Sequence, residues 1–235
     1  MVPYLLLFPL FYVFMRTGNG DAVFKLKRFW ARIIALLVGL YPKVTFRQHR
    51  YKMPSPCIIV CNHTSYLDIV FSPFFIDHTA VFMAKVELMK IPLFGTFFKY
   101  FDIPVDRKSR TGSHRSLVAA ADKIDKGISV IIYPEGTISN EGRLKPFKNG
   151  AFKLAIEKQV PIVPAVNLNN WKFLQNGGFF KSNGAPGVPR IIVGQPISTA
   201  GMTENQVEEL KDKVFTFIHE ELKAYYGTDN YQYHR

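Results

Sequence analysis

The chain has 235 residues, of which 48% are hydrophobic, so it is long enough to bury a full core in one domain. Lysine and arginine total 30 against 18 acidic residues, which gives a formal charge of +12 at pH 7. Residues 1–50 hold much of this excess beside apolar runs, which favours an anionic membrane surface and no nucleic acid as the partner. Cys57 and Cys61 lie roughly 13 Å apart on one apolar strand, too far for a disulfide bond, and this indicates a reducing compartment.

Residues 1–42 are predicted to form a membrane anchor of two short helices. The first apolar run covers residues 1–15 without a charge, and the second, residues 29–41, contains Arg32; residues 16–21 form a polar turn between them. A helix needs roughly 20 residues to cross a bilayer, so both runs are too short. We expect a hairpin that dips into one leaflet, which would make the protein monotopic on the cytoplasmic face of the cell (inner) membrane. The alternative is that both are ordinary core helices.

Residues 43–235 alternate between strand and helix patterns, which is typical of an α/β domain. We expect a mixed, largely parallel central sheet that is flanked by helices. The predicted strands are residues 44–48, 57–61, 81–86, 103–105, 128–133, 162–168 and 190–193. The predicted helices are residues 67–76, 88–101, 113–126, 147–158 and 203–226, and residues 175–189 form a long loop.

His63 follows the predicted strand 57–61, and Asp68 comes five residues later. On a continuous helix the two side chains would point about 140° apart, so a turn must separate them. Ser65 and Asp68 fit the capping-box pattern, which would start a helix near Tyr66 and bring the carboxylate to the imidazole. Asp68 would then hold one ring nitrogen of His63 and leave the other free to take a proton from a hydroxyl group. The alternative is a plain helix cap beside an ordinary loop histidine.

The loop after the strand 128–133 contains Glu135, Gly136 and Thr137. Loops at the carboxyl ends of strands build the binding crevice of an open α/β sheet, so this loop can lie beside His63. Gly136 permits close approach of the backbone, Thr137 offers a hydroxyl group, and Glu135 offers an acceptor. A β-turn that needs proline and glycine only for its shape is an equally simple interpretation.

Lys85 ends one predicted strand and Arg107 follows another, so both side chains can reach the same crevice. An ammonium and a guanidinium group there would suit a phosphate. The lysines further along the chain are expected to be solvated surface residues; they are Lys145, Lys148 and Lys153.

Taken together, these residues resemble the glycerolipid acyltransferase family, the PlsC-like group that contains 1-acylglycerol-3-phosphate acyltransferase. His63 and Asp68 match its His-x4-Asp signature, which is weak by itself, but four further pieces follow in the family's order and extend the resemblance over about residues 57–170. These pieces are Ala84 to Leu88 with Pro92 and Gly95, Ile103 to Arg107, Tyr133 to Thr137, and Val160 to Val166.

The resemblance implies transfer of a fatty acyl group from an acyl-CoA or acyl-carrier-protein thioester to the free hydroxyl of lysophosphatidic acid, which makes phosphatidic acid. It implies that His63 is the general base and that Asp68 orients it, without an acyl-enzyme, a metal or a cofactor. The acceptor-binding residues that it implies are Lys85, Arg107, Glu135, Gly136 and Thr137.

One position departs from the family pattern. Members that act on lysophosphatidic acid usually read Pro-Glu-Gly-Thr-Arg-Ser, and Ile138 stands here in place of that arginine. Loss of a phosphate-facing cation leaves a second acceptor open, a lyso-aminolipid such as a glycine or ornithine lipid. The alternatives from other classes are a hydrolase with Ser65 as its nucleophile and a non-catalytic, basic membrane-binding protein.

Overall fold

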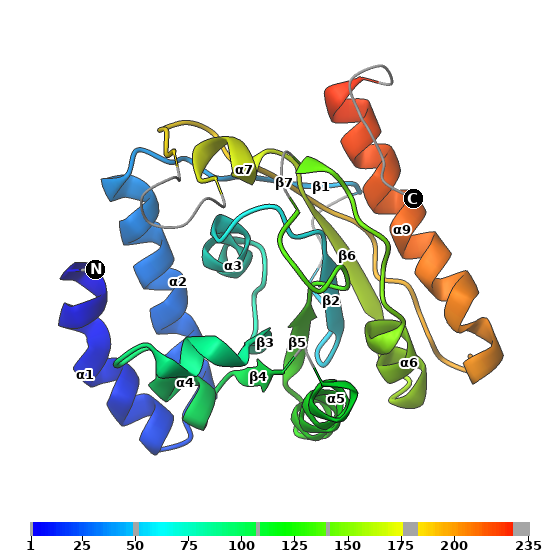
Figure 1. Ribbon diagram of the computed structural model, residues 1–235, viewed down its shortest axis with the longest axis horizontal. Coiled ribbons are helices and arrows are strands. Elements are labelled where there is room, and N and C mark those ends of the chain that lie inside the picture. Colours follow the sequence, from blue (N-terminus) through cyan, green and yellow to red (C-terminus); the bar gives the residue numbers. More distant parts are fainter. Residues whose placement is uncertain (1, 49–51, 107–108, 140–141, 176–182, 228–235) are drawn as a thin grey trace.

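The computed structural model contains a seven-stranded sheet that is enclosed by helices (Figure 1). The strand order is β1-β7-β6-β2-β5-β3-β4, and all neighbours are parallel except β6 and β7. The prediction of a mixed, largely parallel sheet flanked by helices is therefore confirmed. The structure describes residues 2–48, 52–106, 109–139, 142–175 and 183–227. The strands are β1 (Lys43–Phe46), β2 (Ile58–Cys61), β3 (Ala80–Lys85), β4 (Ile103–Val105), β5 (Ser129–Ile132), β6 (Ile162–Asn167) and β7 (Arg190–Val193).

Helices cover both faces of this sheet. The α-helices are α1 (Val2–Arg16), α2 (Gly20–Leu37), α3 (Leu67–Phe71), α4 (Gly95–Tyr100), α5 (Arg110–Asp125), α6 (Gly150–Glu157), α7 (Asn170–Phe173) and α9 (Val207–Tyr226). Short 3-10 turns cover Ser72–Phe74, Val86–Lys90 and Glu204–Gln206.

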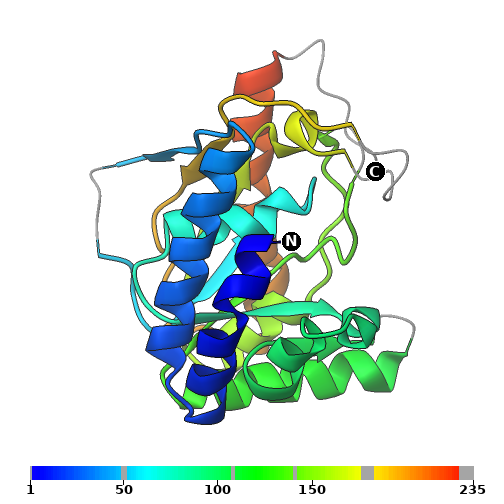
Figure 2. The same cartoon turned by 90° about the vertical axis from the view of Figure 1, so that its left-hand side faces the viewer.

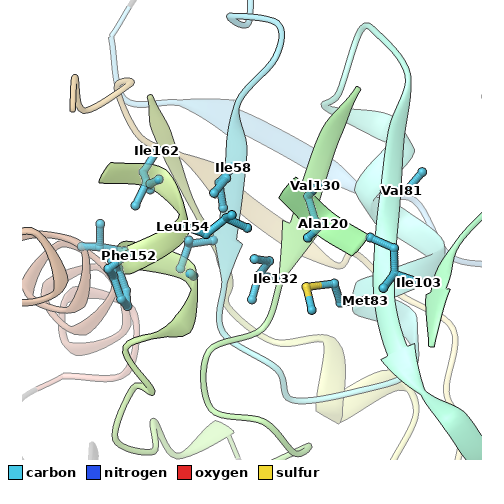
Figure 3. Packing of buried hydrophobic residues seen from close by; sticks show 14 of the residues in the cluster. Ile58, Val81, Met83, Ile103, Ala120, Val130, Ile132, Phe152, Leu154 and Ile162 are labelled. Atoms are coloured by element: carbon cyan, nitrogen blue, oxygen red, sulfur yellow. The ribbon is translucent and has the colours of Figure 1, made fainter. Parts of the chain in front are cut away.

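Alternate residues of β2 face opposite layers of the fold. Ile58 lies in one hydrophobic cluster with Leu154 of α6 and residues of α5 and α9, and Figure 3 shows the two side chains pointing toward one another. Ile59 lies in a second cluster with Phe71 of α3 and residues of α2. Because both faces of β2 are buried, its sequence is a continuous apolar run rather than an alternating one.

Several helices differ from their predicted bounds, and two of these differences have a clear local cause. The predicted helix 88–101 is interrupted because Pro92 has no N–H to donate, and only α4 continues beyond it. The helix expected to begin at Phe29 begins at Gly20, because the Asn19 side chain accepts the N–H of Ala22 at 3.0 Å and caps it there. The short helix α7 was not predicted, and the loop expected over 175–189 falls partly outside the described residues.

The helices α1 and α2 lie side by side, as Figure 2 shows. Their inner face is buried in the same hydrophobic cluster as the sheet, through Tyr4, Phe11 and Met15 of α1 and Val23 of α2. In the part of the chain that the structure describes, no helix is both long and apolar enough to cross a membrane. Large apolar side chains nevertheless remain exposed on this pair of helices, including Leu5, Leu6, Leu10 and Val13 of α1 and Phe29, Leu36 and Leu37 of α2.

An ion pair fastens α2 to the rest of the fold. Lys27 Nζ donates to Asp102 Oδ2 at 2.6 Å, and Asp102 Oδ1 accepts the N–H of Phe82 in β3 at 3.0 Å. The ammonium group also lies 4.4 to 5.0 Å from the ring centres of Phe82, Phe97 and Phe101. Burial lowers the pKa of Lys27, and the attraction of Asp102 opposes that shift. The position of α2 therefore depends on a charge that is largely removed from water.

The parallel strands β2, β3, β5 and β6 bring their carboxyl ends to one edge of the sheet. Since β2 has β5 on one side and β6 on the other, the loops that follow these three strands converge there. All of the described residues that the sequence singles out for chemistry lie in or beside these loops or at the end of β3.

Candidate active site

His63 and Asp68 are in direct contact at this edge. His63 lies in the loop after β2 and Asp68 in the first turn of α3, with 3.0 Å between His63 Nδ1 and Asp68 Oδ2. Both residues are buried: His63 is 5% exposed and Asp68 is 1% exposed. When Nδ1–H donates to the carboxylate, Nε2 carries the lone pair that can accept a proton. The turn that the spacing predicted between the two residues is present.

The Asp68 carboxylate also organises the turn that carries it. Its Oδ2 accepts the N–H groups of Thr64 at 2.6 Å and Ser65 at 2.9 Å, as the acid of a capping box does. The Ser65 hydroxyl does not complete the box, since it accepts the N–H of Leu67 at 3.2 Å and donates to the carbonyl of Leu174 at 2.8 Å. Ser65 is fully buried, which argues against a nucleophilic role for its hydroxyl.

Three buried asparagines adjoin the pair. Asn170 Nδ2 donates to Asp68 Oδ1 at 2.7 Å and to Asn167 Oδ1 at 3.2 Å. The backbone and side chain of Asn167 exchange hydrogen bonds with those of Asn62, which joins the ends of β6 and β2. Sequence reasoning did not predict these contacts. The signal that could have found them is the run of amides after an apolar strand, at Asn167, Asn169 and Asn170.

Glu135 fastens the loop after β5 to the loop after β2. Its Oε1 accepts the N–H of His63 at 2.7 Å and its Oε2 accepts the N–H of Lys145 at 3.0 Å. The N–H of Ser139 donates to the His63 carbonyl at 2.7 Å and closes the same junction. Burial raises the pKa of Glu135 to about 8, although the two backbone donors act to lower it. The backbone of His63 is thus held by one carboxyl group and its ring by another.

Tyr133 connects the histidine to a cavity of about 620 Å³ between α5 and α6. Its ring is stacked on the His63 imidazole, with 4.2 Å between ring centroids and 23° between the planes. The cavity is lined by both apolar and polar side chains. The apolar lining residues include Met83, Val105, Leu117, Ile132 and Ala151, and the polar ones include Ser109, Ser113, His114 and Lys148.

Two lysines lie along the loop in which Ile138 stands. Gly136 has φ +73°, a conformation that favours glycine, and Lys148 Nζ lies 2.9 Å from the point where a Cβ would be. The N–H of Lys148 donates to the Pro134 carbonyl at 3.0 Å. Lys145 Nζ donates to the Ile138 carbonyl at 3.2 Å. Lys148 is exposed and Lys145 is half-buried, so two lysines that the sequence predicted to be surface residues bring positive charge to this loop.

The remaining predicted site residues are more peripheral. Lys85, at the end of β3, is exposed, and its Nζ lies 3.7 Å from Glu87 Oε1. Thr137 is exposed on the loop, and Gly136 lines the cavity. Arg107 lies outside the described residues. The predicted residues that contact one another directly are His63, Asp68 and Glu135.

Comparison with known proteins identifies the family. Residues 43–167, more than half of the chain, match the sequence profile described as Acyltransferase. The chain belongs to the acyltransferase family. This acyltransferase is 32% identical over 212 residues to a 1-acyl-sn-glycerol-3-phosphate acyltransferase of Haemophilus influenzae, which covers 85% of this chain and 81% of that protein. It is 32% identical over 195 residues to the chloroplastic 1-acyl-sn-glycerol-3-phosphate acyltransferase BAT2 of Brassica napus, covering 79% of this chain and 56% of that protein.

The fold of the acyltransferase is also that of a solved structure. The crystal structure of the 1-acyl-sn-glycerophosphate acyltransferase PlsC from Thermotoga maritima matches 94% of this chain and 96% of its own, with a TM-score of 0.72 and 23% sequence identity. The family resemblance expected from the motifs is therefore confirmed, and the protein is an enzyme of the acyltransferase class.

Glu135 should make stability depend on pH. Its pKa is about 8 in the folded protein against an ordinary value of 4.5, so between these values the folded protein holds a proton that the unfolded chain has lost. The free energy of unfolding then falls as pH rises. Relative to Glu135→Gln, which cannot titrate, the wild type should lose about 2 to 4 kcal/mol between about pH 5 and about pH 8 in urea unfolding. A constant difference between the two proteins would contradict this.

Proposed function

We propose that this acyltransferase moves a fatty acyl group from an acyl-CoA or acyl-carrier-protein thioester to the free hydroxyl of 1-acylglycerol-3-phosphate and so produces phosphatidic acid. The observation that carries the proposal is the buried contact between His63 and Asp68, at the edge of the sheet where the loops converge. The names of the bacterial and plant relatives support the choice of acceptor and product.

In the proposed reaction, His63 Nε2 accepts the proton of the acceptor hydroxyl while the hydroxyl oxygen attacks the thioester carbonyl carbon. A new carbon–oxygen ester bond forms and the carbon–sulfur bond breaks. The proton on the imidazolium then passes to the departing thiolate, which leaves as a free thiol. Asp68 stabilises the imidazolium and keeps the ring in the productive orientation. The proposed reaction uses no cofactor and no metal.

The family resemblance implied that Glu135 binds the acceptor. In this proposal Glu135 has a different role. Both of its carboxyl oxygens already accept backbone N–H groups, and 5% of the residue is exposed. We therefore assign it to positioning the His63 backbone, while the Tyr133 ring is stacked on the imidazole. Gly136 and Thr137 remain the members of this loop that we propose to lie against the acceptor.

The acceptor phosphate is proposed to meet Lys148, together with Lys85 and Arg107. Lys148 lies over Gly136 and lines the cavity, so it brings an ammonium group to the loop where Ile138 brings none. Among the ion pairs formed by the described residues, none includes Lys148, which leaves its charge available to an anion. This supports a phosphate-bearing acceptor over a lyso-aminolipid.

We propose that residues 1–42 anchor the protein in one leaflet on the cytoplasmic face of the inner membrane, and that residues 43–235 form the catalytic domain. The exposed apolar side chains of α1 and α2 support this, because a surface of this kind gains free energy on entering lipid. Exposed basic residues on the same helices, at Arg16, Lys25 and Arg32, suit an anionic headgroup layer.

His63→Ala should reduce acyl transfer to background because it removes the base. Asp68→Asn should reduce kcat by roughly a hundredfold or more, because the imidazole loses the charge that stabilises it. Release of free thiol from the thioester, with and without lysophosphatidic acid, measures both effects. Normal turnover by folded His63→Ala protein would exclude the mechanism. Thiol release that ignores the acceptor would indicate a hydrolase, and an absence of thiol release by the wild type would indicate a binding protein.

Lys148→Ala should raise the KM for lysophosphatidic acid by roughly tenfold and leave the KM for the thioester within about twofold, because it removes a charge that contacts only the acceptor. The control is Lys153→Ala, which removes an exposed lysine of α6 that pairs with Glu204. Equal changes in both KM values would count against a phosphate contact. Faster acylation of a lyso-ornithine lipid than of lysophosphatidic acid by the wild type would favour the other acceptor.

The double substitution Leu6→Glu and Leu36→Glu should abolish flotation of the protein with vesicles that contain anionic phospholipid. Leu6 and Leu36 are 75% and 68% exposed, so their replacement should leave the fold intact. Val118→Glu on α5, where 56% of the residue is exposed, is the matched control and should float like the wild type. Undiminished flotation of the double variant would contradict the proposed anchor.

A further inference from the structure

We infer that Asn170, at the start of α7, is a positioning residue of the reaction, which holds the Asp68 carboxylate in the orientation in which it meets His63. The inference rests on the function proposed above for His63 and Asp68. Neither the family profile nor the motif pieces reach this residue, because the profile ends at residue 167 and the motifs end at about residue 166.

Asn170 donates a hydrogen bond to the oxygen of Asp68 that His63 does not contact. Oδ2 accepts hydrogen bonds from His63 Nδ1 and from the N–H groups of Thr64 and Ser65. Oδ1 accepts from Asn170 Nδ2 at 2.7 Å, and the described residues provide no second donor to it. Without Asn170 the Oδ1 atom would lose this donor, and the carboxylate would be held only through the three hydrogen bonds to Oδ2.

The contact is buried on both sides. Asn170 is fully buried and Asp68 is 1% exposed, so bulk water cannot replace the lost donor. A buried carboxylate oxygen without a partner is costly, and hydrogen bonds to charged groups are among the stronger ones in proteins. The loss of this one donor should therefore affect the carboxylate more than the loss of a surface contact would.

The direction of the Asn170 amide also points to this role. Its Nδ2 donates to both Asp68 Oδ1 and Asn167 Oδ1, while its own Oδ1 is buried without a partner among the described residues. Reversing the amide would place two oxygens against one another at the carboxylate. The side chain therefore leaves one acceptor unsatisfied and directs its donor to Asp68.

The end of β6 holds Asn170 in place. The N–H of Asn167 donates to Asn62 Oδ1 at 2.7 Å, and each side-chain amide donates to the other residue's carbonyl at 3.0 Å. These bonds fix the end of β6 against the residue that precedes His63. Asn170 comes three residues after Asn167, and His63 directly follows Asn62. The same junction between the ends of β6 and β2 therefore positions both the Asn170 amide and the His63 imidazole.

The test compares two substitutions at position 170. Asn170→Asp keeps the size of the side chain and removes the donor, and Asn170→Ala removes the amide entirely. Both should lower kcat roughly tenfold or more, while the KM values for thioester and lysophosphatidic acid stay within about twofold. The split is expected because Asn170 acts through Asp68 and contacts neither substrate in this arrangement.

Asn169→Ala is the matched control. Asn169 is 4% exposed, adjoins Asn170, and bonds to Val188, Arg190 and Tyr225 rather than to Asp68. Its replacement should lower the melting temperature, yet kcat per folded enzyme should stay within about twofold of the wild type. An equal loss of kcat in the Asn169 and Asn170 variants would overturn the inference, because it would reveal a general effect on packing.

Two further outcomes complete the test. If Asn170→Asp does not fold, Asn170→Ser, which retains a hydroxyl donor, should keep more kcat than Asn170→Ala, and equal losses would overturn the inference.

His63→Ala separates this inference from the proposed function. An active His63→Ala enzyme would refute both, whereas an inactive one beside Asn170 variants with normal kcat would refute the role of Asn170 alone.

Discussion

The carboxylate of Asp68 is 1% exposed and depends on protein donors for the hydrogen bonds that water would otherwise supply. Its donors come from the loop after β2, through His63, Thr64 and Ser65, and from Asn170 in α7. These two segments meet only because β6 lies beside β2 in the sheet. The direction of the imidazole thus depends on the start of α3, which carries Asp68, and on the strand order, which brings Asn170 to that carboxylate.

Glu135 provides a second buried carboxyl group with a different task. Asp68 contacts the ring of His63, whereas Glu135 accepts the backbone N–H of the same residue. The histidine is therefore restrained at its main chain by the loop after β5 and at its side chain by α3. Tyr133, stacked on the imidazole, limits the remaining movement of the ring. A base that is held in this way loses little freedom when a substrate arrives.

Local patterns predicted the features that depend on a few neighbouring residues. The contact of His63 with Asp68 followed from spacing and a capping pattern, and the sheet type followed from alternating apolar runs. Asn170 was missed because its contact with Asp68 spans 102 residues and depends on strand order, which periodicity does not encode. Lys148 is exposed, as the sequence predicted, but its place over Gly136 was missed because it is set by the course of the loop. The early start of α2 depended on a single cap, Asn19.

The ion pair of Lys27 with Asp102 has a mechanical consequence. Because it ties α2 to β3 and to the aromatic rings around it, the proposed anchor is part of the core and not a tether on a flexible linker. A protein attached to lipid in this way would keep one tilt relative to the bilayer plane. Its acceptor would arrive by lateral diffusion at a crevice of fixed height, so the encounter rate would follow the surface density of the lipid rather than its bulk concentration.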